Sequence, residues 1–217
     1  MLLRHMTLTG AILGGFAIAG TALVALTERD TKDEIEHNEQ ISLQRKLNEV
    51  VPPDVYDNDL ASDTTEVSSK ELLGTPKPVT VYRARKNGTQ VAAIFTAVAP
   101  DGYTGSIRLL IAVRDSDESL LGVRVLEHHE TPGLGDWIES ERSDWIRTFS
   151  GHTLSNPDEL GWRVEKDGGI FDQFTGATIT PRAVVKAVHK GLKYYHLHKD
   201  ELYRPAGDAP AATAGGA

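Results

Sequence analysis

Three threonine hydroxyls lie within one short, glycine-containing segment, residues 168–181, with the sequence GGIFDQFTGATITP. The pair Thr180 and Pro181 predicts that a helix begins there, because threonine caps helix N-termini and proline favours the first helical position. A helix N-terminus presents free N–H groups and the positive end of the helix dipole, so a phosphate would be bound favourably beside it. Small residues precede Thr178 and leave room for a bulky group on its hydroxyl. On spacing alone, a capped helix with a tight turn before it explains the segment more simply.

The composition excludes several other kinds of chemistry. The chain has 217 residues, 40% of them hydrophobic and 25% charged, and contains no cysteine. This excludes thiolate-held iron–sulfur clusters, Cys-ligated zinc, c-type haem attachment, disulfides and cysteine nucleophiles, so a redox function would require another cofactor. The formal net charge of −8 argues against a nucleic-acid partner, because neutralising phosphates requires a basic face.

A second group of candidate residues, His128, His129 and Glu130, has side chains that metals bind. Adjacent residues of a strand or loop point in different directions, however, and no His-x₃-His pair accompanies them. We therefore expect no metal site and assign these residues to the surface or to a cofactor loop. No phosphate-binding Gly-x₄-Gly-Lys-(Ser/Thr) sequence and no recognisable Ser-His-Asp arrangement occurs in the chain.

The N-terminal segment has the length of a membrane anchor. Residues 7–27 are 21 consecutive residues without a charge, which as a helix would span roughly 31 Å. Arg4 precedes them, while Glu28, Arg29 and Asp30 follow, so we expect a cytoplasmic N-terminus and an exported remainder. The alternative is a cleaved signal peptide, but the apolar run exceeds the usual h-region of about 7–15 residues and no Ala-x-Ala site ends it. A buried core helix is less favoured still, because the run has no polar face.

The region after the anchor is acidic. Residues 28–71 hold 13 acidic and 5 basic residues, whereas residues 72–217 are nearly balanced. Residues 28–50 mix charges with apolar residues and predict a helical stalk that the prolines at 52 and 53 end. Residues 54–71 are turn-rich and predict a surface connection or short elements, and we expect their acidic side chains to be solvated.

The rest of the chain predicts one α+β domain. Four β-rich stretches, residues 79–86, 90–98, 105–114 and 120–126, are separated by turn residues, among which Asn87-Gly88 is the strongest hairpin signal. An antiparallel sheet is therefore expected, followed by a helix over residues 137–149 and a second helix from Thr180. The apolar stripe of that second helix consists of Val184, Val185, Val188, Leu192 and Tyr195.

Two motifs resemble those of a known family. Residues 172–178, DQFTGAT, resemble the flavinylation motif Asp-x-x-(Ser/Thr)-Gly-Ala-Thr of periplasmic FMN-binding domains, in which a flavin transferase joins FMN from FAD to the last threonine. Residues 130–135, ETPGLG, are similar to a loop of the G subunit (RnfG) of the Rnf electron-transport complex and of the C subunit of the Na⁺-translocating NADH:quinone reductase. The total chain length favours the Rnf protein.

The resemblance implies a covalent cofactor, FMN, linked through a phosphoester to Thr178. Trp145 could stack on the flavin, but Trp137, Trp145 and Phe149 fit an ordinary helix face, so a core position is preferred. No catalytic residue and no metal are implied. The further cofactor contacts that the resemblance implies are Asp172, Thr175, Gly176, Ala177, Glu130, Thr131, Gly133, Leu134 and Gly135.

The residue patterns and the resemblance, which covers the anchor and roughly residues 75–200, together predict an organisation for the whole chain, and the Ala/Gly/Pro-rich composition of its end predicts a disordered tail. A cytoplasmic N-terminus (1–6) and a transmembrane helix (7–27) precede a juxtamembrane helix and acidic connection (28–74), an FMN-binding domain (75–204) and a disordered tail (205–217). The chain would be a single-pass protein of the bacterial inner membrane with its main domain in the periplasm. Its partners would be the other membrane subunits of the Rnf complex and, during maturation, a flavin transferase.

The expected function is that of an electron relay within an ion-translocating ferredoxin:NAD oxidoreductase. The chain would be a redox subunit without complete catalytic activity alone. It would not itself bind NAD or pump ions, since it has one membrane span and no charge within it. The alternatives are the C subunit of a Na⁺-translocating NADH:quinone reductase and a solitary anchored flavoprotein reductase. A non-redox binding or assembly domain, with the threonine motif only a helix cap, is a third possibility.

Overall fold

A computed structural model describes residues 2–203 of the chain. The chain divides into two units, Met1–Gln44 and Arg45–Ala217. Helix α1 (Leu2–Val50) forms all of the described part of the first unit and ends in the second. The predicted disordered tail, residues 205–217, lies outside the described residues.

Helix α1 contains the predicted anchor. Within residues 2–203 the structure has one helix long and apolar enough to cross a membrane, His5–Arg29, with a mean hydropathy of 1.9 and no residue of its apolar window buried. The helix continues without a break through the predicted stalk and ends at Val50, two residues before Pro52. Proline cannot continue a helix, so the observed end agrees with the sequence pattern.

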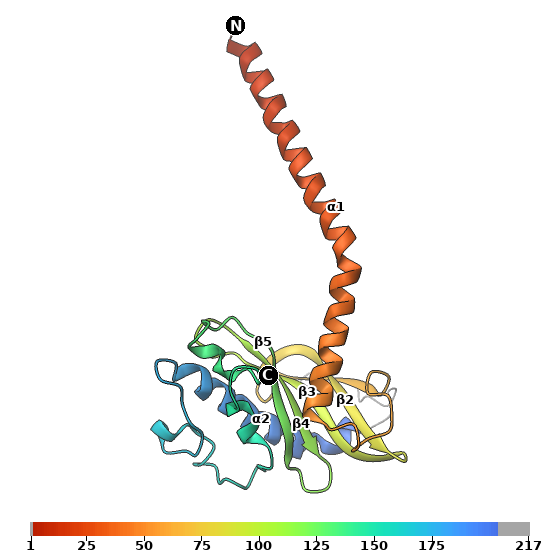
Figure 1. Ribbon diagram of the computed structural model, residues 1–217, viewed down its shortest axis with the longest axis vertical. Coiled ribbons are helices and arrows are strands. Elements are labelled where there is room, and N and C mark those ends of the chain that lie inside the picture. Colours follow the sequence, from red (N-terminus) through yellow and green to blue (C-terminus); the bar gives the residue numbers. More distant parts are fainter. Residues whose placement is uncertain (1, 204–217) are drawn as a thin grey trace, which may run out of the picture. The chain divides into compact units, whose positions relative to one another are not determined.

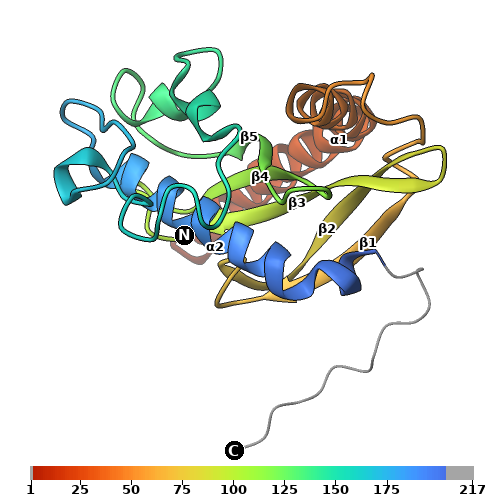
Figure 2. The same ribbon diagram turned by 90° about the horizontal axis from the view of Figure 1, so that it is seen from below.

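The second unit is built around a five-stranded antiparallel sheet. Figure 1 labels strands β2 to β5 of this sheet, and Figure 2 labels all five. The hairpin between β2 and β3 turns at Asn87 and Gly88, both with positive φ (50° and 76°), which is the conformation of a tight two-residue hairpin. The four predicted strands correspond to β2–β5, with ends that differ by at most four residues. Strand order follows the chain: β1 (Thr64–Ser69), β2 (Thr75–Lys86), β3 (Thr89–Ala99), β4 (Ile107–Arg114) and β5 (Leu120–Glu127).

Strand β1 lies in the acidic stretch of residues 54–71, for which we expected a surface connection or short elements. Its sequence, TTEVSS, lacks a strong apolar alternation, so pairing with β2 rather than propensity forms it. The expectation of a solvated acidic run is wrong for Asp63. Its carboxylate accepts hydrogen bonds at 2.6 Å from the Nε atoms of both Arg83 and Arg85.

One face of the sheet is covered by helix α2 (Ile179–Leu202), as Figure 2 shows from below. Gly191 permits the close approach, since a Cβ there would lie 2.7 Å from Ile111 Cδ1. The predicted apolar stripe of this helix is buried throughout, with each of its five residues at most 2% exposed. The predicted α+β class, an antiparallel sheet with a flanking helix, is thereby confirmed.

The segment between β5 and α2 differs from the expectation. The predicted helix over residues 137–149 is wrong: the structure has two short 3₁₀ helices, η1 (Gly135–Ile138) and η2 (Trp145–Phe149), and a third, η3 (Glu165–Asp167), follows. The hydroxyl of Ser143 donates to the carbonyl of Trp137 at 2.6 Å and also accepts from the N–H of Trp145. A serine that binds backbone groups in this way competes with a continuous helix.

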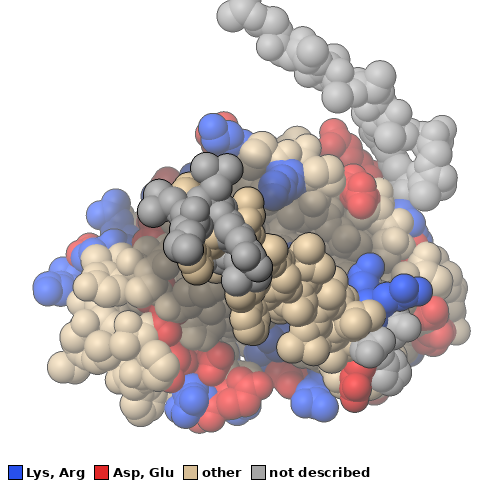
Figure 3. All heavy atoms as spheres, turned by 90° about the horizontal axis from the view of Figure 1, so that it is seen from above, with Lys and Arg blue, Asp and Glu red and all other residues tan. Residues whose placement is uncertain are grey.

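The surface of the second unit carries both signs of charge. In Figure 3 the acidic and basic side chains are interspersed around the visible face rather than separated by sign. This distribution on the visible face agrees with the nearly balanced charge of residues 72–217.

Candidate functional site

A pocket of about 130 Å³ lies where three segments of the second unit meet. Tyr103 comes from the connection between β3 and β4, a second group from the loop after β5, and a third from the segment that leads into α2. Its lining consists of Tyr103, Glu130, Thr131, Leu134, Gly135, Gly176, Ala177, Thr178, Ile179 and Thr180.

The first wall of the pocket is the loop of residues 130–135, which we call the loop wall. Pro132 and Gly133 occupy the centre of a tight turn in which the N–H of Leu134 donates to the carbonyl of Thr131 at 3.1 Å. Gly133 has a φ of +78°, which the third position of such a turn requires and which glycine adopts without strain. The carboxylate of Asp136 accepts from the N–H of Gly133 at 2.7 Å and fixes the turn.

Glu130 joins the three segments that form the pocket. Its side chain is buried, at 5% exposure, and each carboxylate oxygen accepts one hydrogen bond. Oε1 accepts from the N–H of Thr104 at 3.2 Å, and Oε2 accepts from the hydroxyl of Thr180 at 2.7 Å. Gly102 and Gly135 make room for it, because a Cβ at either glycine would lie within 3.0 Å of a carboxylate oxygen.

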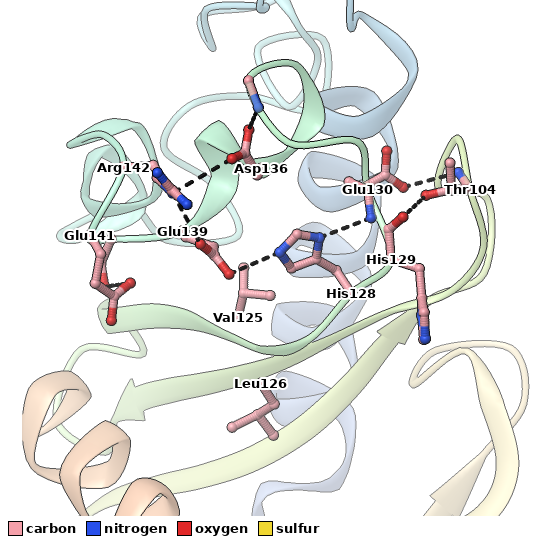
Figure 4. A network of polar contacts seen from close by, with 12 residues as sticks. Thr104, Val125, Leu126, His128, His129, Glu130, Asp136, Glu139, Glu141 and Arg142 are labelled. Carbon is pink, nitrogen blue, oxygen red and sulfur yellow. Dashed lines mark hydrogen bonds and ion pairs between the residues drawn. The ribbon is translucent and has the colours of Figure 1, made fainter.

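A polar network supports the loop wall from behind, as Figure 4 shows. The Nδ1 atom of His128 accepts from the N–H of Glu130 at 3.0 Å, so a neutral ring carries its proton on Nε2, which lies 2.9 Å from Glu139 Oε1. Arg142 lies 3.5 Å from Asp136 Oδ2 and 3.7 Å from Glu139 Oε2. Both carboxylates of the network are thereby oriented by a cation.

The second wall is the segment of residues 172–178, which we call the threonine segment. It contains another tight turn, in which the N–H of Ala177 donates to the carbonyl of Phe174 at 3.1 Å and Gly176 has a φ of +84°. A Cβ at Gly176 would lie 3.5 Å from the side chain of Leu134, so the two glycine turns face each other across the pocket.

Thr178 is the N-cap residue of α2, and its hydroxyl makes no capping hydrogen bond. The prediction that Thr180 caps this helix is wrong, because α2 begins at Ile179 and the hydroxyl of Thr180 binds Glu130 instead. The partner is 50 residues away in sequence, so local spacing could not identify it. The half-buried Thr178 side chain lines the pocket and makes no side-chain hydrogen bond within residues 2–203.

Most of the predicted cofactor contacts meet in this pocket. Three of them do not line it: Asp172, Thr175 and Gly133. Asp172 and Thr175 are exposed, and the backbone carbonyl of Asp172 accepts from the indole N–H of Trp145 at 2.8 Å. The predicted residues that do line the pocket are Glu130, Thr131, Leu134, Gly135, Gly176, Ala177 and Thr178.

Three residues that line the pocket were not predicted as site residues. Tyr103 and Ile179 are largely exposed (68% and 45%) and bring apolar surface to the pocket, and Thr180 binds Glu130. Ile179 and Thr180 follow directly after the flavinylation-like motif, whereas no motif marks Tyr103. Trp145 is in the core, edge-on to Phe149 and Phe174, in agreement with the preferred interpretation.

The electrostatics of the pocket come from one carboxylate and one helix end. Glu130 is the sole charged residue of the lining, and no lysine or arginine belongs to it. The nearby Arg182 is bound to both carboxylate oxygens of Asp167, at 2.6 and 2.9 Å. A group of three or more His, Asp or Glu side chains that could hold a metal ion is not found within residues 2–203.

The chain is similar to known proteins over most of its length. Residues 102–193 match the FMN-binding domain family, and residues 1–50 match the RnfG N-terminal region family. The G subunit of the ion-translocating oxidoreductase complex of Aliivibrio fischeri is 47% identical, over 93% of this chain and 95% of the relative.

Two further proteins extend the comparison. The protein of the same description from Pseudomonas aeruginosa is 46% identical, over 93% of this chain and 94% of the relative. The crystal structure of Shewanella oneidensis NqrC is 24% identical with a TM-score of 0.46, and the match covers 67% of this chain and 74% of that one.

Proposed function

The chain belongs to the family of G subunits of ion-translocating oxidoreductase complexes and contains an FMN-binding domain, and from this premise we propose that FMN is joined through its phosphate to the hydroxyl of Thr178. As a member of that family, the chain is a membrane-anchored redox subunit of a larger complex and carries electrons on FMN. The site of attachment, the covalent bond and the orientation in the membrane are the parts that we propose here.

The observation that carries the proposal is the free hydroxyl of Thr178. An N-cap threonine usually accepts a hydrogen bond from an N–H group of the first helical turn, and losing that bond costs about 0.5–2 kcal/mol. In α2 the hydroxyl makes no such bond, although the residue is in the capping position and lines the pocket. A hydroxyl left without a structural bond beside a pocket is available as a phosphoryl acceptor.

The start of α2 also suits the phosphate that such a bond would leave beside it. The N–H groups of Ile179 and Thr180, the first two residues of α2, have no intrahelical acceptor, Pro181 carries no N–H, and the helix dipole is positive at this end. Because no cationic side chain lines the pocket, these N–H groups would supply the stabilisation of the phosphate charge.

The attachment reaction needs FAD as co-substrate and a flavin transferase as catalyst. A bond forms between Thr178 Oγ1 and the phosphorus of the FMN portion, the pyrophosphate bond of FAD breaks, and AMP leaves. The hydroxyl proton passes to a base of the transferase. The tether gives the flavin an effective concentration of about millimolar or higher at its site, so none is lost in a compartment without a flavin supply.

The pocket of about 130 Å³ is smaller than the roughly 300–1,000 Å³ of sites that enclose a small molecule, so it would hold the phosphate end of FMN while the ring system lies on the surface around it. Tyr103, Leu134 and Ile179 offer exposed apolar surface around the pocket, and the glycine turns let backbone groups approach closely. When bound, FMN supplies one- and two-electron chemistry, and the protein's part is to hold and orient it. Asp172 and Thr175 lie outside the pocket and are exposed, so we assign them to recognition by the transferase.

We place the FMN-binding domain in the periplasm and the N-terminus in the cytoplasm. Arg4 precedes the apolar span and an acidic region follows it, which agrees with the positive-inside rule. The electron donor and acceptor are then other membrane subunits of the complex. Co-purification of the full chain with multi-spanning partners tests this arrangement against a solitary reductase.

The proposed attachment is tested by the mass of the full chain after co-expression with a flavin transferase. We expect an added FMN phosphoester on a peptide that contains Thr178, and its complete loss in Thr178→Val. The matched control is Thr131→Val, which removes another hydroxyl of the same pocket and should keep the mass shift. If Thr178→Val keeps the added mass, or if the wild-type chain never acquires it, the proposal is wrong.

A further inference from the structure

The carboxylate of Glu130 occupies an unusual position for a charged group. It is buried in the wall of the pocket, and its two hydrogen bonds come from neutral donors, the N–H of Thr104 and the hydroxyl of Thr180. No ion pair with a lysine, arginine or histidine involves it among the described residues. The nearby cation, Arg142, lies against Asp136 and Glu139 instead.

Both carboxylate oxygens of Glu130 are placed to accept hydrogen bonds. A backbone N–H can only donate, so Oε1 is an acceptor, and the hydroxyl of Thr180 donates to Oε2. Burial of an unpaired charge is costly, and it persists in a fold when other interactions or function require it.

We propose that Glu130 is a positioning residue of the flavin site, which joins the three segments of the pocket and places a negative charge beside the bound flavin. The proposal rests on the proposed function, because it concerns the environment of FMN on Thr178. Glu130 and Thr178 line the same pocket. A group attached at Thr178 would therefore lie beside the pocket that the Glu130 carboxylate lines.

The first half of the proposal concerns shape. Thr104 precedes β4, Glu130 follows β5 and Thr180 belongs to the first turn of α2, so two hydrogen bonds to one carboxylate hold these three segments together. The glycines at 102 and 135 pack directly against that carboxylate, which leaves no space for it to move aside. The direction in which Thr178 presents its hydroxyl thus depends on Glu130 through Thr180.

The second half concerns charge. Reduction adds electrons to the flavin, and a negative charge nearby in a poorly hydrated site disfavours that addition. Charges beside a flavin are one of the means by which proteins set its reduction potential. Glu130 accordingly lowers the reduction potential of the attached FMN, and the hydroxyl of Thr180 moderates this effect by sharing the charge through its hydrogen bond.

The test is the midpoint potential of the attached FMN in the full chain, purified in detergent after co-expression with a flavin transferase. Glu130→Gln keeps the size of the side chain and one acceptor but removes the charge, so we expect a more positive potential. The matched control is Glu141→Gln, an exposed carboxylate of the same region outside the pocket, for which we expect the wild-type potential. Equal potentials in wild type, Glu130→Gln and Glu141→Gln overturn the proposal.

A second pair of variants keeps the charge and changes the hydrogen bond. Thr180→Val removes the donor, so the charge is less shared and the potential should become more negative, with a lower temperature of unfolding. Thr180→Ser restores a donor hydroxyl and should return both values toward wild type. If Thr180→Val changes neither quantity, the joining role is wrong, even where Glu130→Gln fails to fold.

The covalent flavin content of each sample, from its mass and absorbance, is measured first. A wild-type chain without attached FMN contradicts the proposed function. If FMN is attached but its midpoint potential is the same in wild type and in the Glu130 and Thr180 variants, this inference alone is contradicted.

Discussion

The two walls of the pocket resemble each other in backbone shape and differ in what holds them. Each contains a tight turn with a glycine at positive φ, Gly133 in the loop wall and Gly176 in the threonine segment. The loop wall is held by the buried carboxylates of Glu130 and Asp136. In the threonine segment, within the described part of the chain, one side chain is hydrogen-bonded, that of Gln173.

The difference separates residues that shape the site from residues that are free to react. The carboxylates of Glu130 and Asp136, which hold the loop wall, already accept hydrogen bonds from backbone N–H groups and a hydroxyl. The side-chain oxygens of Asp172, Thr175 and Thr178 make no hydrogen bonds within residues 2–203. A reactive group must be accessible, and a positioning group must be fixed. The chain assigns these requirements to different segments.

The largest expected effect compares Asp136, the aspartate that fixes the loop wall, with Asp172, an aspartate of the threonine segment. Asp136→Ala should lower the free energy of unfolding by about 2–3 kcal/mol, since it removes a charged acceptor and leaves the N–H of Gly133 without its partner. Asp172→Ala, in the threonine segment, should change it by less than about 0.5 kcal/mol. Chemical unfolding of the full chain followed by tryptophan fluorescence measures both values.

Covalent FMN content should change in the opposite order. Asp172→Ala should reduce it strongly, whereas Asp136→Ala should retain it at temperatures where the variant is folded. Equal losses of stability in the two variants would remove the distinction between the walls.

The next effect compares a glycine from each wall. In Gly135→Ala the new Cβ would lie 2.7 Å from Glu130 Cβ and Oε2, so we expect a loss of about 1–3 kcal/mol from overpacking. In Gly176→Ala the nearest atom is 3.5 Å away, and the positive φ alone should cost about 1 kcal/mol. Chemical unfolding followed by tryptophan fluorescence measures both losses of stability. If Gly176→Ala loses more free energy of unfolding than Gly135→Ala, the threonine segment is the more tightly packed wall.

Hydrogen exchange provides a third comparison, without mutation. In the flavin-free chain the amides of the loop wall should exchange on average at least about tenfold more slowly than those of the threonine segment, a difference of about 1.4 kcal/mol. Four backbone N–H groups of the loop wall have hydrogen-bond acceptors, those of Glu130, Gly133, Leu134 and Gly135. In the described threonine segment one backbone N–H group has an acceptor, that of Ala177. Attachment of FMN should narrow the gap, and a gap that stays constant would indicate that the flavin does not order the threonine segment.

The smallest effect concerns the outer part of the network behind the loop wall. Arg142 is 60% exposed and its contacts with Asp136 and Glu139 are 3.5 and 3.7 Å long. Arg142→Ala should therefore lower the free energy of unfolding by less than about 1 kcal/mol, as for other surface ion pairs. Unfolding at low and high salt checks the assignment, because the difference from wild type should shrink as salt screens the pair. If Arg142→Ala lowers the free energy of unfolding as much as Asp136→Ala does, Arg142 is one of the residues that hold the loop wall in place.

Much of the fold could be predicted from the sequence, and the predictions that were wrong share a physical cause. The strands, the apolar stripe of α2 and the location of the threonine segment rest on local patterns, and the structure contains them. Thr180 was misassigned as a cap because a carboxylate distant in sequence competes for its hydroxyl. Ser143 divides a helical pattern by binding backbone groups, and β1 exists because β2 pairs with it.

The site shows the same limit. Motif residues identified both walls, yet the role of Glu130 depends on three segments that meet only in the fold. Tyr103 joins the pocket for the same reason, since nothing in its neighbourhood of the sequence marks it. Local sequence patterns thus could not predict the long-range polar contacts that form the site.

The order of the strands has a consequence for how the site comes into being. Each strand pairs with the strand just before it in the chain, so the sheet can assemble hairpin by hairpin while the chain is still emerging. Glu130 emerges immediately after β5, whereas Thr178 and Thr180 emerge only with the start of α2. A nascent chain can therefore complete its sheet before it contains Thr178, the residue proposed as the acceptor of FMN. With Thr178 as the proposed acceptor, attachment of FMN can begin only when the start of α2 has been synthesised, after all five strands of the described sheet.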